Sequence, residues 1–518
     1  MKIRICFTLI IVILFLAACG SRSSQENNVY GYEQDYNDSA YEHLEEESLP
    51  SYSDGGAVAV AETSPEPTPE VRAPLTREGL LYDFDYMMQL MEDSFPYFGV
   101  AYRRLGVDIR ALADKTRAII ENYPYSMQEL ADSIGIAIED MPELDEQVFW
   151  AILSHEFFDK FRGLAHADVL ALPTFSSLRH SFAGASSPFN REAFRNPVTI
   201  RFYEEQDEFI ATIFDSEDWD MLYFILRRPP PGTIQSDDMI QEEPTPNLVM
   251  EIIEDGKIAY MSFASFMYPS FPLYWRPLTE FYREIYSYEH LIIDIRNNSG
   301  GSIDFWRMLI MYPLWADRDY MPNMLLYAFY VDSELGQLLG DAHHEAESDW
   351  FASRFVPEND YMLTIDEIVA ASHLPYINED DLRHLAYGNR FNTSIANIEG
   401  RHFQGVHMTP MSHYPFHGQI WLLTCSYNAS STALFSRHAK YMGFATLVGE
   451  QVSGAYTAHF RTFFSLPNTG IMVTWDIDYL VDQYGRSLEE FPTIPHYFNR
   501  EGMDALETVL SMISEGTY

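Results

Sequence analysis

The chain is poor in cysteine and in basic residues. Its three cysteines among 518 residues, Cys6, Cys19 and Cys425, provide no disulfide framework. Only 33 basic residues stand against 77 acidic ones, and this excess of negative charge argues against nucleic acid or an anionic bilayer as the bound surface. The histidines between positions 343 and 417 lack the HExxH spacing that places two metal ligands on one helix face. We therefore expect no metal site and no cofactor.

The N-terminus looks like a bacterial export signal. Two basic residues precede an apolar run over residues 7–18, which is too short to span a membrane but suits a signal peptide. The sequence LAAC at positions 16–19 resembles a lipobox. We expect residues 1–18 to be removed and Cys19 to be lipidated, which would anchor the protein to the membrane from outside the cytoplasm. An ordinary signal peptide with an incidental cysteine is the alternative.

The rest of the chain divides by composition. Residues 19–75 are acidic and proline-rich without helical or strand periodicity, so they are predicted to be a disordered linker. Residues 76–170 carry apolar residues three and four apart, which predicts a helical subdomain. Residues 171–518 are predicted to form one α/β (α+β mixed) domain, and the alternation within 195–262 predicts several strands there. Residues 315–418 form a long insertion, expected to cap a cleft.

Two strand–loop–helix units stand out in this domain. HLIIDIRNNSGG, at 290–301, begins as a buried strand and ends in two glycines before an apolar, helix-compatible segment. IWLLT, at 420–424, is a second buried strand, followed by the polar loop CSYNASS and another helical segment. Loops at the carboxyl ends of strands are where α/β sheets bind ligands. The two loops would bring hydroxyls and bare amides together, as a serine acyl-transfer site requires.

Four motifs resemble those of the S41 peptidases, the family of C-terminal processing and tricorn-type proteases. DIRNNSGG is similar to the family's D-x-R-x-N-x-G-G, and LLTCSYNASSTALF is similar to its nucleophile segment. LVGEQVSG resembles G-E-x-T-x-G, and DQYGRSLEEFPTIPHYF resembles D-x-x-G-x-x-x-E-G-x-G-x-x-P-D. The motifs occur in the family's order and cover residues 250–500. The resemblance implies a ClpP/crotonase-like βα core, a polypeptide substrate and hydrolysis of peptide bonds through an acyl-enzyme.

The resemblance also assigns a nucleophile and its electrostatic support. Ser430 takes the position of the family serine, and a shifted register would favour the neighbouring hydroxyls of Ser426 or Ser431 instead. The oxyanion donors implied are the backbone N–H of Ser431 and that of Gly300 or Gly301.

The base is expected to be a histidine. The processing-protease branch uses a lysine after G-E-x-T-x-G, and this chain has Ala455 there. His166 resembles the histidine of the tricorn-type segment D-G-H-[ST], with His155 as its competitor. Glu489 aligns with the family glutamate and is expected to help fix and stabilise the catalytic group.

Three functions compete at this stage. The resemblance favours a membrane-anchored extracytoplasmic serine peptidase. A catalytically inactive S41-like lipoprotein that binds peptides or a protein partner is the alternative, supported by Thr432 and Ala433 where the family has alanine and glutamate. An esterase or small-ligand receptor would require a closed apolar pocket. The sequence carries no signal for an oligomeric state.

Overall fold

The computed structural model describes residues 75–518, apart from residues 135–136, 183–186, 215–246, 267–270, 318–323, 351–355, 358–362, 372–373, 393–400, 404–405, 409–411 and 455–460. The predicted signal peptide, the lipidation site Cys19 and the linker up to residue 74 lie outside the described residues. Across the described part of the chain, no helix is both long and apolar enough to cross a membrane.

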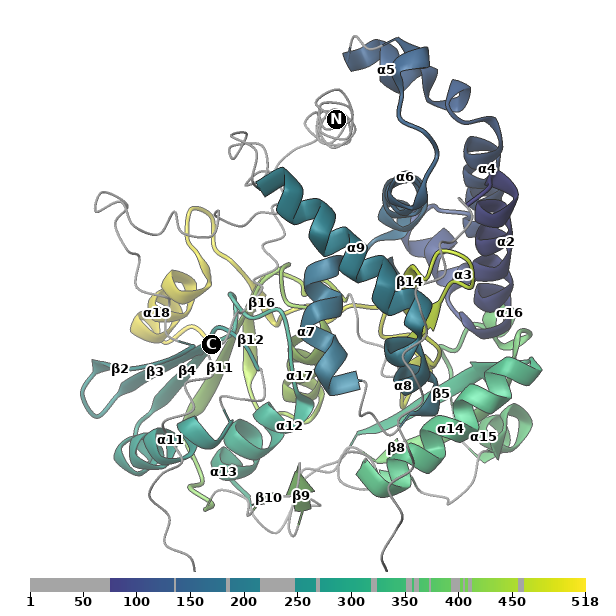
Figure 1. The fold of residues 1–518 in the computed structure, drawn as a ribbon. Coiled ribbons are helices and arrows are strands. Elements are labelled where there is room, and N and C mark those ends of the chain that lie inside the picture. Colours follow the sequence, from purple (N-terminus) through teal and green to yellow (C-terminus); the bar gives the residue numbers. More distant parts are fainter. Residues whose placement is uncertain are drawn as a thin grey trace, which may run out of the picture.

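The first described segment is helical, as its periodicity predicts (Figure 1). Its helices are α2 (Arg77–Ser94), α3 (Phe98–Val100), the π-helix η2 (Ala101–Leu105), α4 (Ile109–Asn122), η3 (Tyr125–Met127), α5 (Gln128–Ile134), η4 (Ile138–Asp140), α6 (Glu146–Ile152), the π-helix η5 (Leu153–Phe157) and η6 (Phe158–Phe161). Asp108 caps α4 by accepting hydrogen bonds from two first-turn amides. The buried face of α4 consists of residues three and four apart, Ile109, Ala113, Thr116 and Ile120, so the helix packs by one stripe.

The prediction of strands in the first part of 195–262 is wrong. Helix α9 (Pro197–Phe214) occupies this region, after α7 (Leu172–Phe182) and α8 (Pro188–Arg195). The alternation in VTIRFY suggested a strand, but Thr199, Phe202, Tyr203 and Gln206 are the buried residues, and their spacing is that of one helix face. The alternating segment at residues 222–227 lies outside the described residues, and the last two segments are strands as predicted, β2 (Leu248–Glu254) and β3 (Ile258–Phe263).

A six-stranded sheet forms the core of the larger domain (Figure 1). Its order is β16-β12-β11-β4-β3-β2, and every neighbouring pair is parallel except β2–β3. The additional strands are β4 (His290–Asp294), β11 (Gln419–Thr424), β12 (Thr446–Gly449) and β16 (Tyr497–Phe498). All five residues of β4 are buried, which explains the apolar run Leu291–Ile293 at its centre.

Helices cover both faces of this sheet. Figure 1 shows α18 (Ala505–Glu515) on one side and α11 (Phe271–Ile285) with α13 (Tyr312–Leu314) on the other. Ile292 packs in the cluster with α18, whereas Leu291 and Ile293 belong to the main core on the opposite face. The main core also includes α12 (Ile303–Trp306), the π-helix η8 (Arg307–Met311) and α17 (Ser430–Tyr441). The predicted mixed α/β fold is therefore confirmed.

The insertion contributes most of a second sheet. Its elements are β5 (Leu325–Val331), α14 (Glu334–Trp350), β6 (Val356–Pro357), β7 (Leu363–Thr364), α15 (Ile365–Ala371), α16 (Glu379–Leu382), β8 (Leu385–Asn392), β9 (Arg401–Phe403) and β10 (Val406–Met408). Strands β5 to β8 form one sheet that is completed at its edge by β15 (Tyr479–Asp482), from beyond the insertion. The insertion is therefore built into the domain through β15.

A small antiparallel sheet links the helical segment to the C-terminal part. Its order is β1-β14-β13, with β1 at Asp168–Val169, β13 at Arg461–Ser465 and β14 at Met472–Asp476. Strands β13 and β14 form an antiparallel hairpin, connected by residues 466–471. Because β1 begins two residues after His166, its pairing with β14 places the histidine loop beside the end of that strand.

Candidate active site

The histidine loop is held by Asp476, the last residue of β14. His166 Nδ1 lies 2.7 Å from Asp476 Oδ2, and the Asp476 backbone amide donates to the carbonyl of Ala165 at 2.7 Å. The Asp476 side chain is fully buried. A buried carboxylate on Nδ1 orients an imidazole ring and favours the tautomer whose Nε2 can accept a proton. Sequence analysis missed Asp476, although a carboxylate inside the apolar run of β14 was a usable signal.

The backbone of this loop is strained. Ala165 and His166 have φ values of 47° and 49°, a left-handed conformation that side-chain-bearing residues rarely adopt. Glu489 Oε2 accepts a hydrogen bond from the Ala165 amide at 3.2 Å, and the Glu489 side chain is fully buried. Glu489 therefore contacts the backbone of the histidine loop, whereas Asp476 contacts the imidazole of His166.

Ser430 lies at the turn between a buried strand and a helix. It is the first residue of α17, five residues beyond Cys425, and its φ of 50° is again left-handed. A strained strand-to-helix turn is how other hydrolases present a nucleophilic serine. Ser430 is half-buried, and no described residue hydrogen-bonds to its hydroxyl. His166 and Ser430 are therefore not joined by a direct hydrogen bond, a contact that often tightens only when substrate binds.

The glycine loop lies against this serine. A Cβ built on Gly300 would be 2.9 Å from the Cβ of Ser430, so only a glycine permits this approach. The Gly300 amide donates to Asn298 Oδ1 at 2.9 Å and is thereby engaged. Gly301 is exposed, and its amide has no acceptor among the described residues. Ser431 stands in the first turn of α17, where backbone amides lack an intrahelical acceptor. The backbone amides of Gly301 and Ser431 are therefore better placed than the amide of Gly300 to donate to an oxyanion.

Buried amide side chains tie the two loops together. Asn298 Oδ1 accepts hydrogen bonds from the Gly300 amide and, at 2.9 Å, from Thr432 Oγ1. Asn428 Nδ2 donates to the carbonyls of Ile295 and Asn298 at 2.6 and 3.0 Å. Thr432, which departs from the family pattern, therefore has a definite partner in the opposite loop. These hydrogen bonds fix the glycine loop relative to the serine turn.

The residues that are alternatives to Ser430 as nucleophile and to His166 as base form polar contacts with other side chains. Ser426 Oγ donates to Glu450 Oε2 at 2.8 Å, and Ser431 Oγ accepts from the indole of Trp306 at 3.0 Å. His155 Nδ1 lies 2.9 Å from Asp159 Oδ2, one helical turn away, in a partly exposed pair. Of the sequence-predicted residues, the structure therefore brings Ser430, Gly300 and Gly301 together, and it places His166 beside Asp476.

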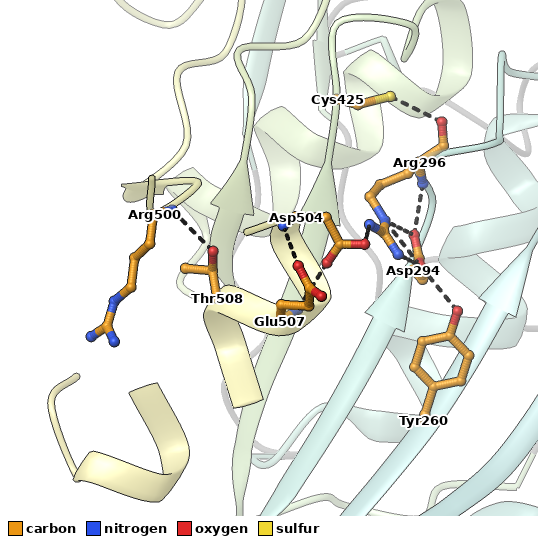
Figure 2. Close-up of polar contacts among 8 residues, drawn as sticks. All are labelled: Tyr260, Asp294, Arg296, Cys425, Arg500, Asp504, Glu507 and Thr508. Atoms are coloured by element: carbon orange, nitrogen blue, oxygen red, sulfur yellow. Dashed lines mark hydrogen bonds and ion pairs between the residues drawn. The ribbon is translucent and has the colours of Figure 1, made fainter. Parts of the chain in front are cut away.

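The charged residues of the DIRNNSGG motif form a cluster of polar contacts, shown in Figure 2. Arg296 contacts Asp294 at 2.7 Å and Asp504 at 2.9 Å, and Tyr260 donates its hydroxyl to Asp294 at 3.0 Å. Asp504 is the N-cap of α18 and forms a capping box with Glu507. This cluster therefore fastens α18 to the carboxyl end of β4.

Cys425 joins the same cluster. Its thiol donates to the carbonyl of Arg296 at 2.9 Å (Figure 2). Burial raises the pKa of the Cys425 thiol, so the thiolate form is disfavoured. This agrees with a packing role for the cysteine. In the described residues, no group of three or more histidine, cysteine, aspartate or glutamate side chains is arranged to hold a metal ion.

A serine at a strained turn, amides from a glycine loop and a histidine–carboxylate pair are the parts of a serine hydrolase. Residues 257–497 match the model of peptidase family S41, so the chain carries an S41 peptidase domain over this range. Ser430 and Asp476 lie inside the matched range, and His166 lies before it.

Solved structures provide further comparisons. A lipoprotein from Streptococcus agalactiae is 12% identical, with 86% of this chain and 100% of that chain covered and a TM-score of 0.38. A putative peptidase from Parabacteroides merdae is 11% identical, with coverage of 85% and 97% and a TM-score of 0.40. Mature CPAF is 13% identical, with coverage of 85% and 95% and a TM-score of 0.44. Among curated proteins, none matches this chain.

Proposed function

We propose that this protein is a serine peptidase that cleaves polypeptides outside the cytoplasm, tethered to the membrane by a lipid on Cys19, with His166 as its base. The contact between His166 Nδ1 and Asp476 Oδ2, at 2.7 Å, is the observation that carries the proposal. It supports a proton-accepting Nε2 in a chain that has Ala455 at the position of the family's lysine. The LAAC sequence supports the anchor.

The proposed reaction follows from these positions. Ser430 Oγ attacks the scissile carbonyl carbon while His166 Nε2 takes the hydroxyl proton. The amides of Ser431 and Gly301 donate to the oxyanion that forms, and the loss of one such donor typically costs about a hundredfold or more in rate. His166 then gives the proton to the leaving amine, and water hydrolyses the acyl-enzyme with the same histidine as base. Asp476 stabilises the imidazolium that forms between these steps.

A second function has its own support. Thr432 and Ala433 stand where the family has alanine and glutamate after the serine, which favours a protein that retains the site's shape but binds peptides without cleaving them. In that case the extended peptide would occupy the same surface near Ser430.

Active-site labelling of the purified full chain separates the two functions. A fluorophosphonate probe should label Ser430, identified by peptide mass spectrometry, and the label should be lost in Ser430→Ala and His166→Ala. Ser426→Ala and His155→Ala are the matched controls and should label like the wild type. A folded wild-type protein that is not labelled would favour the binding function. Labelling that persists in His166→Ala would show that another group is the base.

A further inference from the structure

Arg104 connects the two loops of the site from a distant part of the chain. It belongs to the π-helix η2, in the helical segment that precedes the family match. Arg104 Nη2 donates to the carbonyl of Ser453 at 2.9 Å, and Nη1 lies 3.5 Å from Glu489 Oε2. The guanidinium therefore contacts two segments that are far apart in sequence.

Each of these contacts leads directly to one catalytic loop. On one side, the same Oε2 atom of Glu489 accepts the hydrogen bond from the Ala165 amide, next to His166. On the other side, Ser453 donates to the Asn428 carbonyl through both its amide, at 3.0 Å, and its hydroxyl, at 2.7 Å. Asn428 stands two residues before Ser430 in the serine turn.

The electrostatics give Arg104 a defined task. The Glu489 side chain is 0% exposed and that of Arg104 is 20% exposed, so this ion pair is largely shielded from water. A buried carboxylate requires a nearby counter-charge, and removing that charge is strongly destabilising. A guanidinium can pair with a carboxylate and donate to a carbonyl at once because its N–H groups form a rigid fork. A lysine ammonium has only one nitrogen for both tasks.

The neighbouring arginine extends the connection away from the site. Arg103 contacts Asp381 of the insertion at 2.6 Å and Glu490 at 2.7 Å. The π-helix thus presents two consecutive arginines to the consecutive residues Glu489 and Glu490, and π-helical turns are frequent at functional sites.

We propose that Arg104 is a positioning residue that sets the distance between the histidine loop and the serine turn. This inference rests on the proposed peptidase function for its effect on rate, and on the contacts alone for its effect on the two loops. The helical segment is then part of the catalytic apparatus.

The test compares Arg104→Ala and Arg104→Lys with Arg110→Ala in the full chain. Arg110 is a suitable control because it also lies in the helical segment and forms an ion pair, with exposed Glu92. Two quantities are measured: the rate of fluorophosphonate labelling per folded molecule, and hydrogen exchange in peptides that contain Ala165 or Asn428. We expect Arg104→Ala to slow labelling by about 10- to 100-fold, the range caused at metal sites by loss of a contact that orients a ligand. It should also accelerate exchange in both peptides.

The conservative variant distinguishes positioning from general stability. Arg104→Lys retains the charge beside Glu489, so it should restore part of the labelling rate and protect the Ala165 peptide more than the Asn428 peptide. Unchanged exchange in both loops of Arg104→Ala would overturn the inference, whatever the labelling shows. Where the wild type is labelled, a labelling rate per folded molecule of Arg104→Ala equal to that of Arg110→Ala would also overturn it. If the wild type is not labelled but exchange rises in both loops, the peptidase function fails and the positioning role stands.

Discussion

Asp476 Oδ2 lies 2.7 Å from His166 Nδ1, although 310 residues separate the two in sequence. The contact depends on the pairing of β1 with β14, which also brings the Asp476 amide to the Ala165 carbonyl. Both the ring and the backbone of the histidine loop are therefore held by one residue.

Asp476→Asn should nearly abolish the reactivity of Ser430. An amide in place of the carboxylate favours the wrong histidine tautomer and removes the charge that stabilises the imidazolium, so we expect a fall in labelling rate of about a thousandfold or more. The labelling rate is measured by stopping the reaction with a fluorophosphonate at successive times. Asp159→Asn is the matched control because Asp159 contacts the other candidate histidine, His155. If Asp159→Asn lowered the labelling rate strongly and Asp476→Asn did not, His155 rather than His166 would be the base.

Gly300→Ala should damage the site through the backbone. Gly300 has a φ of 136°, and an added Cβ would lie 2.9 Å from the Cβ of Ser430. The glycine loop must then move away from the serine turn, and we expect labelling to fall by about a hundredfold because the oxyanion donors move with it. Gly256→Ala is the control, since Gly256 has a φ of 71° and nothing lies within 4 Å of the position that an added Cβ would take. Equal labelling rates in the two variants would contradict the expected approach of the loops.

Stability should fall in mild acid because of His438. Burial within α17 lowers the pKa of His438 to about 3, whereas an unfolded histidine titrates near about 6.5. As the pH falls below 6.5 the unfolded chain takes up a proton that the folded chain does not, so the stabilisation present at neutral pH is progressively lost. Between pH 7 and pH 5 this amounts to about 2 kcal/mol of unfolding free energy. Urea unfolding of His438→Gln should show a smaller loss by about that amount, and an identical loss in variant and wild type would refute the assignment.

Asp83 should be a major anchor of the hairpin that carries Asp476. Its Oδ1 accepts from the amide and the side chain of Asn468, and its Oδ2 accepts from the amide and the hydroxyl of Thr469. Asp83→Asn replaces one acceptor by a donor facing these groups, and we expect a loss of about 3 kcal/mol in unfolding free energy.

Asp85→Asn provides the control for this measurement. Asp85 lies two residues further along α2 and pairs with Arg117 at an exposed site, where such pairs contribute about 0–1 kcal/mol. Denaturant unfolding of both variants checks the comparison. A loss in Asp83→Asn no larger than that in Asp85→Asn would show that the hairpin does not depend on α2.

The parts of the site that follow from local pattern could be predicted from the sequence. The turn at Ser430 and the loop ending in Gly300 each come from a buried strand followed by small residues, and both strands lie where the apolar runs indicate. A carboxylate within the apolar run of β14 marks Asp476 as unusual, but its partner could not be predicted from local pattern, because the contact depends on the pairing of β14 with a two-residue strand far upstream. The same limit applies to α9, where alternation over six residues outweighed the helical spacing of the longer segment.

The pairing of β1 with β14 also has a consequence for biosynthesis. A growing chain that ends before residue 470 already contains His166, the glycine loop and Ser430, but it lacks the strand that bears Asp476. The histidine loop is then without its buried carboxylate and without the amide that holds Ala165. Under the proposed function, the peptidase remains inactive during synthesis, so the unfinished chain and the factors that handle it are not exposed to an assembled protease.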